Sequence, residues 1–99
     1  MGKRETEYQK ELKSRIATRF PGCIILKNDS ELKPGIFDLV ILYGTRYAAL
    51  EVKRDKNAPL RPNQDYYMEE IIKMGGFAAF IYPENEERVL DEIQRAFES

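Results

Sequence analysis

The feature that most constrains the fold is the stretch from Pro34 to Lys53, PGIFDLVILYGTRYAALEVK. Residues 36–43 form an apolar and β-branched run, and residues 46–53 form a second one. Gly44 and Thr45 separate them, which predicts a β-hairpin with a tight two-residue turn. Three charged side chains, Asp38, Glu51 and Lys53, interrupt this otherwise apolar hairpin.

The turn predicts how the charged residues face one another. A two-residue loop places Tyr43 opposite Arg46, and the same register places Asp38 directly across from Glu51. Their Cβ atoms would then be roughly 5 Å apart. Because side chains alternate along a strand, Glu51 and Lys53 share one face, and Phe37 points to the face opposite Asp38.

Two carboxylates that face each other in a half-buried sheet are destabilising unless something compensates them. A divalent cation between Asp38 and Glu51 would do so, and Mg²⁺ accepts a few hard oxygen ligands together with water and phosphate. Lys53 could then approach a bound water or a phosphate oxygen. The hairpin thus favours a metal-dependent phosphoryl-transfer site. The alternative is a solvated strand face, and a one-residue bulge would break the register.

Bulk properties narrow the class of protein. The chain has 99 residues, with 42% hydrophobic and 33% charged residues, which is typical of one globular domain spanning residues 1–99. The net charge of −1 provides no overall basic field, and no apolar run approaches the ~20 residues that cross a bilayer. We therefore expect no membrane partner. With no histidine and Cys23 as the one cysteine, zinc sites and histidine-based triads are excluded and a reducing, cytoplasmic location is expected.

The rest of the chain predicts a mixed α/β fold. Residues 4–20 read as an amphipathic helix whose apolar stripe also carries Glu5. Strands are expected at 23–26 and 77–82, and helices at 62–74, headed by Gln64, and from Pro83 onward. The order α-β-β-β-α-β-α implies an antiparallel meander followed by a parallel fourth strand, with helices on both faces of the sheet.

The motifs on these elements resemble those of the PD-(D/E)XK nuclease superfamily. More narrowly, they are similar to the small stand-alone phage and bacterial members of the virus-type replication-repair nuclease (VRR-NUC) family. The resemblance covers roughly residues 5–82 and implies a restriction-endonuclease-like α-β-β-β-α-β core, here with an extra C-terminal helix. The matching residues are Glu5, Lys27, Gly35–Leu39, Glu51–Arg54, Leu60, Pro62, Gln64 and Gly75.

The resemblance implies metal-dependent hydrolysis of DNA phosphodiester bonds, with Mg²⁺ or Mn²⁺ as cofactor. Asp38, Glu51 and the main-chain carbonyl of Val52 would be the metal ligands. Lys53 would position or help to deprotonate the attacking water and offset transition-state charge. Gln64 would orient a ligand, the water or a phosphate. Glu5 would add an acid from the first helix, with Glu7 as the alternative.

Two positions depart from the family pattern. The usual proline before the metal-binding aspartate is Phe37, and the small hydroxyl residue that often precedes the helix proline is Arg61. Arg61 removes an N-cap but could contact a phosphate. Lys27, Arg54 and Lys56 are further candidates for DNA contact, although each could be an ordinary surface charge.

The relatives of this type are similar to Holliday-junction resolvases, which implies a homodimeric endonuclease acting on branched DNA in repair. We expect such an enzyme in the cytoplasm of a bacterium or a phage-infected cell. Two alternatives stay open. One is a flap or single-strand nuclease with the same chemistry, and the other is a catalytically silent module that binds DNA structures.

Overall fold

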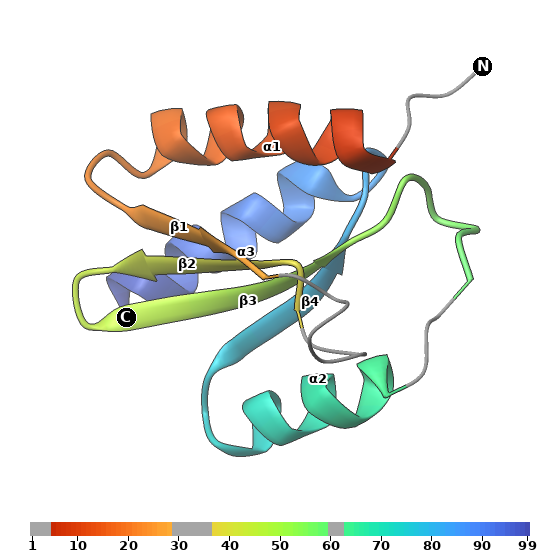
Figure 1. Cartoon of the computed structure of the whole chain (residues 1–99). Helices are drawn as coiled ribbons and strands as arrows, with labels where there is room; N and C mark the ends of the chain where they lie inside the picture. Colours follow the sequence, from red (N-terminus) through yellow and green to blue (C-terminus); the bar gives the residue numbers. More distant parts are fainter. Residues whose placement is uncertain (1–4, 29–36, 60–62) are drawn as a thin grey trace.

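A computed structural model describes residues 5–28, 37–59 and 63–99 of the chain. These residues form three helices and a four-stranded sheet (Figure 1). Among the described helices, none combines the length and the apolar composition that spanning a bilayer requires. The elements are, in order, α1 (Glu5–Arg19), β1 (Ile24–Lys27), β2 (Leu39–Tyr43), β3 (Arg46–Val52), α2 (Gln64–Lys73), β4 (Phe77–Ile81) and α3 (Glu86–Glu98).

The sheet has the predicted mixed topology. Its strand order is β1-β2-β3-β4; the first three strands pair antiparallel, and β4 pairs parallel to β3. In the hairpin, Tyr43 pairs with Arg46 and Leu39 pairs with Leu50, so the turn at Gly44-Thr45 and the predicted register are confirmed. Gly44 has a φ of 62°, a left-handed conformation that glycine adopts without steric cost. The element order and topology match the restriction-endonuclease-like fold.

Helices cover both faces of the sheet, as expected. The layer of α1 and α3 lies on one face and α2 on the other (Figure 1). The larger core, between the sheet and the α1/α3 layer, contains the predicted stripe of α1 and the inward residues of the central strands. Its fully or nearly fully buried members include Tyr8, Leu12, Ile16, Phe20, Leu39, Ile41, Leu50, Val52, Ile81, Val89 and Ile93. A smaller core of Phe37, Ala49 and Met68 lies beneath α2.

The structure corrects the prediction at the start of the hairpin. β2 begins at Leu39, and Phe37 packs with Ala49 and Met68 beneath α2 instead of beside Leu39. The strict alternation of a strand does not extend to Phe37, because the backbone there lies outside the ladder. The expected start of this strand at Ile36 lies outside the described residues.

The last helix also begins later than its sequence predicts, at Glu86 instead of Pro83. The side chain of Asn85 explains this difference. Its Oδ1 accepts a hydrogen bond from the backbone N–H of Tyr82 (2.9 Å), and its Nδ2 donates to the carbonyl of Phe80 (3.1 Å). These contacts hold residues 82–85 in a turn, so the helix starts after it.

A polar cluster of Tyr8, Arg15 and Glu86, here named the α1–α3 network, fastens α1 to α3. Tyr8 Oη donates to Glu86 Oε1 (2.9 Å), and Arg15 donates to both carboxylate oxygens through Nε (2.6 Å) and Nη2 (2.8 Å). Burial alone raises the pKa of Glu86, but the hydrogen bonds from Arg15 and Tyr8 outweigh it and lower the pKa below its usual range. Burial and the bond to Glu86 raise the pKa of Tyr8 above its usual range.

Candidate active site

The polar residues of the hairpin meet where the β2–β3 ladder ends. The last pair of the ladder is Leu39 with Leu50, and one residue further along lie Asp38 and Glu51. Oδ2 of Asp38 accepts a hydrogen bond from the backbone N–H of Val52 at 2.8 Å. A side-chain oxygen thus takes the place of the next main-chain acceptor, which explains why β2 stops at Leu39. The Asp38 carboxylate is therefore bonded to the backbone of Val52, the residue directly after Glu51.

Glu51 and Lys53 face α2. Ala49 belongs to the small core beneath α2, and side chains two residues apart on a strand share a face, so Glu51 and Lys53 point the same way. On β4, Glu51 lies beside Phe80, which is also part of that core. Glu51 is 1% exposed and Asp38 7%. Carboxylates buried this deeply, on neighbouring strands, are costly without compensation.

Two hydrogen bonds hold the ammonium group of Lys53 beside an aromatic ring. Its Nζ donates to Oε1 of Gln64 (2.8 Å) and to the carbonyl of Pro59 (2.9 Å), and it lies 5.8 Å from the centre of the Phe80 ring. Lys53 is 4% exposed and Gln64 2%. We name Asp38, Glu51, Lys53 and Gln64 the candidate centre.

Gln64 is the first residue of α2, and the residue before it has an uncommon backbone conformation. The preceding Asn63 has a φ of 68° and a ψ of 2°, a left-handed conformation that asparagine tolerates better than most residues. The chain therefore turns sharply into α2, and the buried side chain of Gln64 reaches Lys53 on the sheet. The predicted start of this helix at Pro62 lies outside the described residues.

Asn28 is a positioning residue that the sequence reasoning missed. Its backbone N–H donates to the carbonyl of Asp38 (2.9 Å), and its Nδ2 donates to the carbonyl of Phe37 (2.7 Å). Asn28 thus continues the β1–β2 pairing past Lys27 and fixes the backbone of Asp38 from the other side. Its place two residues after the strand predicted at 23–26 was the one available signal. The carbonyl of Pro59 was missed because no side-chain pattern identifies a main-chain acceptor.

The donors of the candidate centre suit a hard divalent cation. Asp38 and Glu51 supply carboxylate oxygens, and the carbonyl of Val52 is directed to the same side of β3 as Asp38. This follows because Lys53 bonds through its N–H to Ile81 on β4, and successive residues direct their backbone groups to alternate neighbours. Among the described residues, no group of three or more His, Cys, Asp or Glu side chains is placed to hold an ion. Water would have to complete the coordination, which Mg²⁺ commonly retains.

The sequence also predicts that an acid of the first helix, Glu5 or alternatively Glu7, joins Asp38 and Glu51. Glu5 is half-buried at the first residue of α1, and α1 begins above the end of the sheet where β3 and β4 finish (Figure 1). Glu7 is exposed. Burial therefore favours Glu5 over Glu7, although the described geometry does not add Glu5 to Asp38 and Glu51 as a third clustered acid.

The expected DNA contacts are spread around the candidate centre. Lys27 is exposed at the end of β1, where it pairs with Leu39 beside Asp38. Arg54 is exposed and lies 3.6 Å from a carboxylate oxygen of Asp55. Lys56 is exposed on the segment after β3, and Arg61 lies outside the described residues.

No known family model matches this chain, and no match to a curated protein sequence is significant. Among solved structures, it is similar to one described as a VRR_NUC domain. The two are 26% identical, with a TM-score of 0.69, and the match covers 91% of this chain and 94% of the other.

A weaker similarity is to Hjc from Archaeoglobus fulgidus, described as a Holliday junction resolvase from an archaeal hyperthermophile. Here the identity is 22%, the TM-score 0.46, and the coverage 74% of this chain and 67% of the other. The assignment of the fold therefore depends on the first similarity. The chain has a nuclease fold of the restriction-endonuclease-like type and, as its motifs indicate, resembles the VRR-NUC family of the PD-(D/E)XK superfamily.

Proposed function

We propose that this chain is a DNA endonuclease that depends on Mg²⁺ or Mn²⁺ and hydrolyses phosphodiester bonds. The observation that carries the proposal is the arrangement at the end of β3. Asp38, Glu51 and Lys53 are all buried there, the Asp38 carboxylate accepts from the N–H of Val52, and Gln64 bonds to the ammonium group of Lys53. The similarity to a VRR_NUC domain over nearly the whole chain supports this use of the site.

Asp38, Glu51 and the carbonyl of Val52 would hold the metal ion. When bound, such an ion activates water and neutralises charge on the phosphate. The hydrogen bond from Val52 to Asp38 leaves the second carboxylate oxygen of Asp38 for a ligand and restricts the rotation of the side chain. The protein would therefore present its anionic oxygens in a fixed arrangement.

Lys53 would supply positive charge where negative charge develops on the phosphate, and would help to position the attacking water and favour its deprotonated form. Its two hydrogen bonds, to Gln64 and Pro59, hold the ammonium group within one region without neutralising it. Gln64 would thus act mainly through Lys53. Glu5 would contribute a further carboxylate from the start of α1.

For the substrate, we propose branched DNA, including four-way junctions, cut by a homodimer. This step depends on the resemblance in the motifs, because a two-fold symmetric pair of sites suits two symmetric cuts. Exposed apolar side chains on the edge strand β1, Ile24 (58%) and Leu26 (46%), are candidates for burial between two copies. Analytical ultracentrifugation of the wild type and of Leu26→Lys tests this assembly. A wild-type monomer at assay concentrations would contradict it.

The central experiment compares cleavage of matched duplex, flap, fork and four-way-junction DNA in Mg²⁺ or Mn²⁺, with Glu51→Ala as the inactive control. Paired symmetric cuts on the four-way junction support the resolvase-like proposal. Cuts confined to flaps or single strands would keep the chemistry and replace the substrate. Tight junction binding without any cleavage would favour a silent binding module.

Metal binding can be tested without cleavage. A ligand that binds the folded state alone stabilises it by about 2.7 kcal/mol at a hundred times its Kd. Added Mg²⁺ or Mn²⁺ should therefore raise the melting temperature of the wild type, and Asp38→Asn should abolish the rise. Asparagine keeps an oxygen that can accept from Val52, so the variant separates charge from structure. An unchanged metal response in Asp38→Asn would exclude Asp38 as a ligand.

A further inference from the structure

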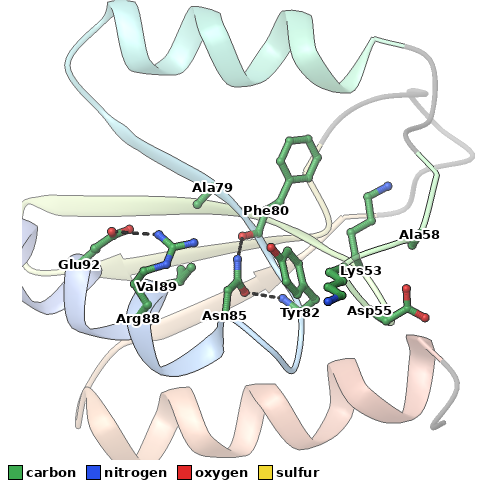
Figure 2. A pocket seen from close by; sticks show the side chains of 11 residues that line it. Lys53, Asp55, Ala58, Ala79, Phe80, Tyr82, Asn85, Arg88, Val89 and Glu92 are labelled. Carbon is green, nitrogen blue, oxygen red and sulfur yellow. Dashed lines mark hydrogen bonds and ion pairs between the residues drawn. The ribbon is translucent and has the colours of Figure 1, made fainter.

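A pocket of about 420 Å³ opens next to the candidate centre, along the outer edge of β4 (Figure 2). The C-terminal half of β4 and Tyr82 form its floor. The segment from Lys53 to Ala58 forms one wall, and the first turns of α3 form the other. Lys53 belongs both to this lining and to the candidate centre, so a ligand in the pocket would lie beside the candidate centre.

Asn85 is a buried polar residue in the lining of this pocket. Through its two hydrogen bonds, to the carbonyl of Phe80 and the N–H of Tyr82, its amide satisfies outward backbone groups of the edge strand (Figure 2). An edge strand with free backbone groups would invite another strand to pair with it. Here the polar groups beside the pocket are already bonded, and a ligand would meet side chains.

The lining combines aromatic rings with cations. Phe80 and Tyr82 are the aromatic residues of the lining, with the Phe80 ring pointing toward α2 (Figure 2), and Lys56 adds positive charge to that of Lys53. The two acids of the lining, Asp55 and Glu92, have cationic neighbours, Arg54 at 3.6 Å and Arg88 at 3.1 Å. Aromatic faces beside cationic side chains are how proteins bind single-stranded nucleic acid, through base stacking and phosphate contact.

We propose that the pocket binds one unpaired nucleotide of the DNA strand that enters the candidate centre. Its base would stack against Tyr82, and its phosphate would lie near Lys56. The inference rests on the proposed function, because it takes DNA as the substrate. The volume lies toward the lower end of the ~300–1,000 Å³ range of small-ligand pockets and suits a single nucleotide.

The pocket would make the enzyme selective for DNA structure without reading sequence. A nucleotide in a duplex must unpair and unstack before it can enter, and this cost is smallest where the strand is already single or disrupted. Branch points, forks and flaps supply such nucleotides next to a duplex. The pocket thus provides a physical reason for this fold to prefer branched over continuous duplex DNA.

A protein–DNA double-mutant cycle tests the proposal. Binding of a forked DNA to Glu51→Gln protein, which is expected not to cut, is measured by fluorescence anisotropy. An abasic site is moved through the nucleotides around the branch point. Tyr82→Leu should weaken binding of the intact fork about tenfold. On the fork whose abasic site lies at the nucleotide bound by the pocket, the same substitution should cost less than about twofold.

Two control variants separate the pocket from folding and from general charge. Tyr82→Phe keeps the ring and should bind as the parent does. Lys56→Gln, on an exposed side chain, should weaken fork binding several-fold, whereas Lys73→Gln on α2 should not. An equal loss from Tyr82→Leu on intact and abasic forks at every position would overturn the proposal, as would normal binding by both Tyr82→Leu and Lys56→Gln.

Cleavage by the wild type, measured in parallel, distinguishes the two levels of failure. If the wild type cuts forks but Tyr82→Leu and the abasic site weaken binding additively at every position, the pocket proposal fails and the proposed function stands. If no DNA is bound or cut, the proposed function fails and the pocket proposal fails with it.

Discussion

The α1–α3 network and the candidate centre are both buried polar clusters, but their charges are arranged in opposite ways. In the network, Glu86 is the buried acid, and Arg15, which also lies 3.7 Å from the more exposed Glu11, binds it with two hydrogen bonds. In the candidate centre, two acids lie together, and the cation Lys53 donates to the neutral oxygens of Gln64 and Pro59.

The first arrangement is typical of a polar cluster that stabilises a fold, and the second is typical of a ligand-binding site. Arg15 and Glu86 compensate each other's charge within the folded chain and need no ligand, and removing one of them leaves the other uncompensated. The two buried carboxylates of the candidate centre and an ammonium group bonded to neutral oxygens are an arrangement that suits a metal ion and a phosphate as ligands. Substitutions should therefore affect stability in the network and activity in the candidate centre.

The largest expected effect is from Glu51→Gln. Removing one negative charge from the carboxylate pair should lower DNA cleavage by about a thousandfold or more, because a metal ligand is weakened. The melting temperature without metal should stay the same or rise, because repulsion with Asp38 is relieved. Cleavage rates and thermal unfolding of the same preparation test both statements, with Glu84→Gln as an exposed control. A strong loss of apo stability would show that Glu51 is structural.

The coupling of Gln64 to Lys53 should produce the next largest effects. Lys53→Ala should lower turnover by about a hundred- to a thousandfold, and Gln64→Ala by about ten- to a hundredfold. Because Gln64 acts through Lys53, adding Gln64→Ala to Lys53→Ala should lower turnover little further. Single-turnover rates and DNA dissociation constants for the four proteins provide the test. Fully additive losses, or losses in affinity alone, would refute the coupling.

The network should respond in stability instead. Glu86→Gln removes the charge that Arg15 and Tyr8 bond to, and should lower the free energy of unfolding by about 1–3 kcal/mol. The guanidinium of Arg15 is partly exposed, so solvent screening favours the lower end of this range. Cleavage per folded molecule should remain within a factor of about two. Denaturant unfolding and rate measurements well below the melting temperature decide this, and a loss of turnover would link the network to the site.

The pH dependence of stability should show the smallest effects. The folded-state pKa of Glu86 lies below its ordinary value of 4.5, so its contribution is present above that pH and is lost as the pH falls. The pKa of Tyr8 is raised above its ordinary value of 10.0, so its contribution is present below that pH and is lost as the pH rises. Unfolding free energies of Glu86→Gln and Tyr8→Phe should be flatter than wild type at the acid and alkaline ends, respectively. If the unfolding free energies of the variants and the wild type changed with pH in parallel, the hydrogen bonds of the network would be contradicted.

Local patterns predicted most of the fold for identifiable reasons. A two-residue turn determines the register of a hairpin, so the pairing of Leu39 with Leu50 followed from Gly44-Thr45. The i, i+4 spacing of the apolar stripe predicted the buried face of α1. The prediction for Phe37 was wrong because the Asp38 side chain, and not the Phe37 carbonyl, accepts the hydrogen bond from the N–H of Val52. The Phe37 carbonyl accepts from Asn28 instead. The spacing of apolar residues does not reveal where a side-chain oxygen replaces a main-chain acceptor of the sheet.

By itself the sequence determined the order of elements, the hairpin register and the shared face of Glu51 and Lys53, because these depend on residues close together in the chain. Only the tertiary structure decided what lies around them. It brought Gln64 and the carbonyl of Pro59 to Lys53, set Asn28 behind Asp38, and formed a pocket between β4 and α3. These contacts join separate elements through loops and main-chain oxygens, which carry no periodic signal, so packing alone specifies them.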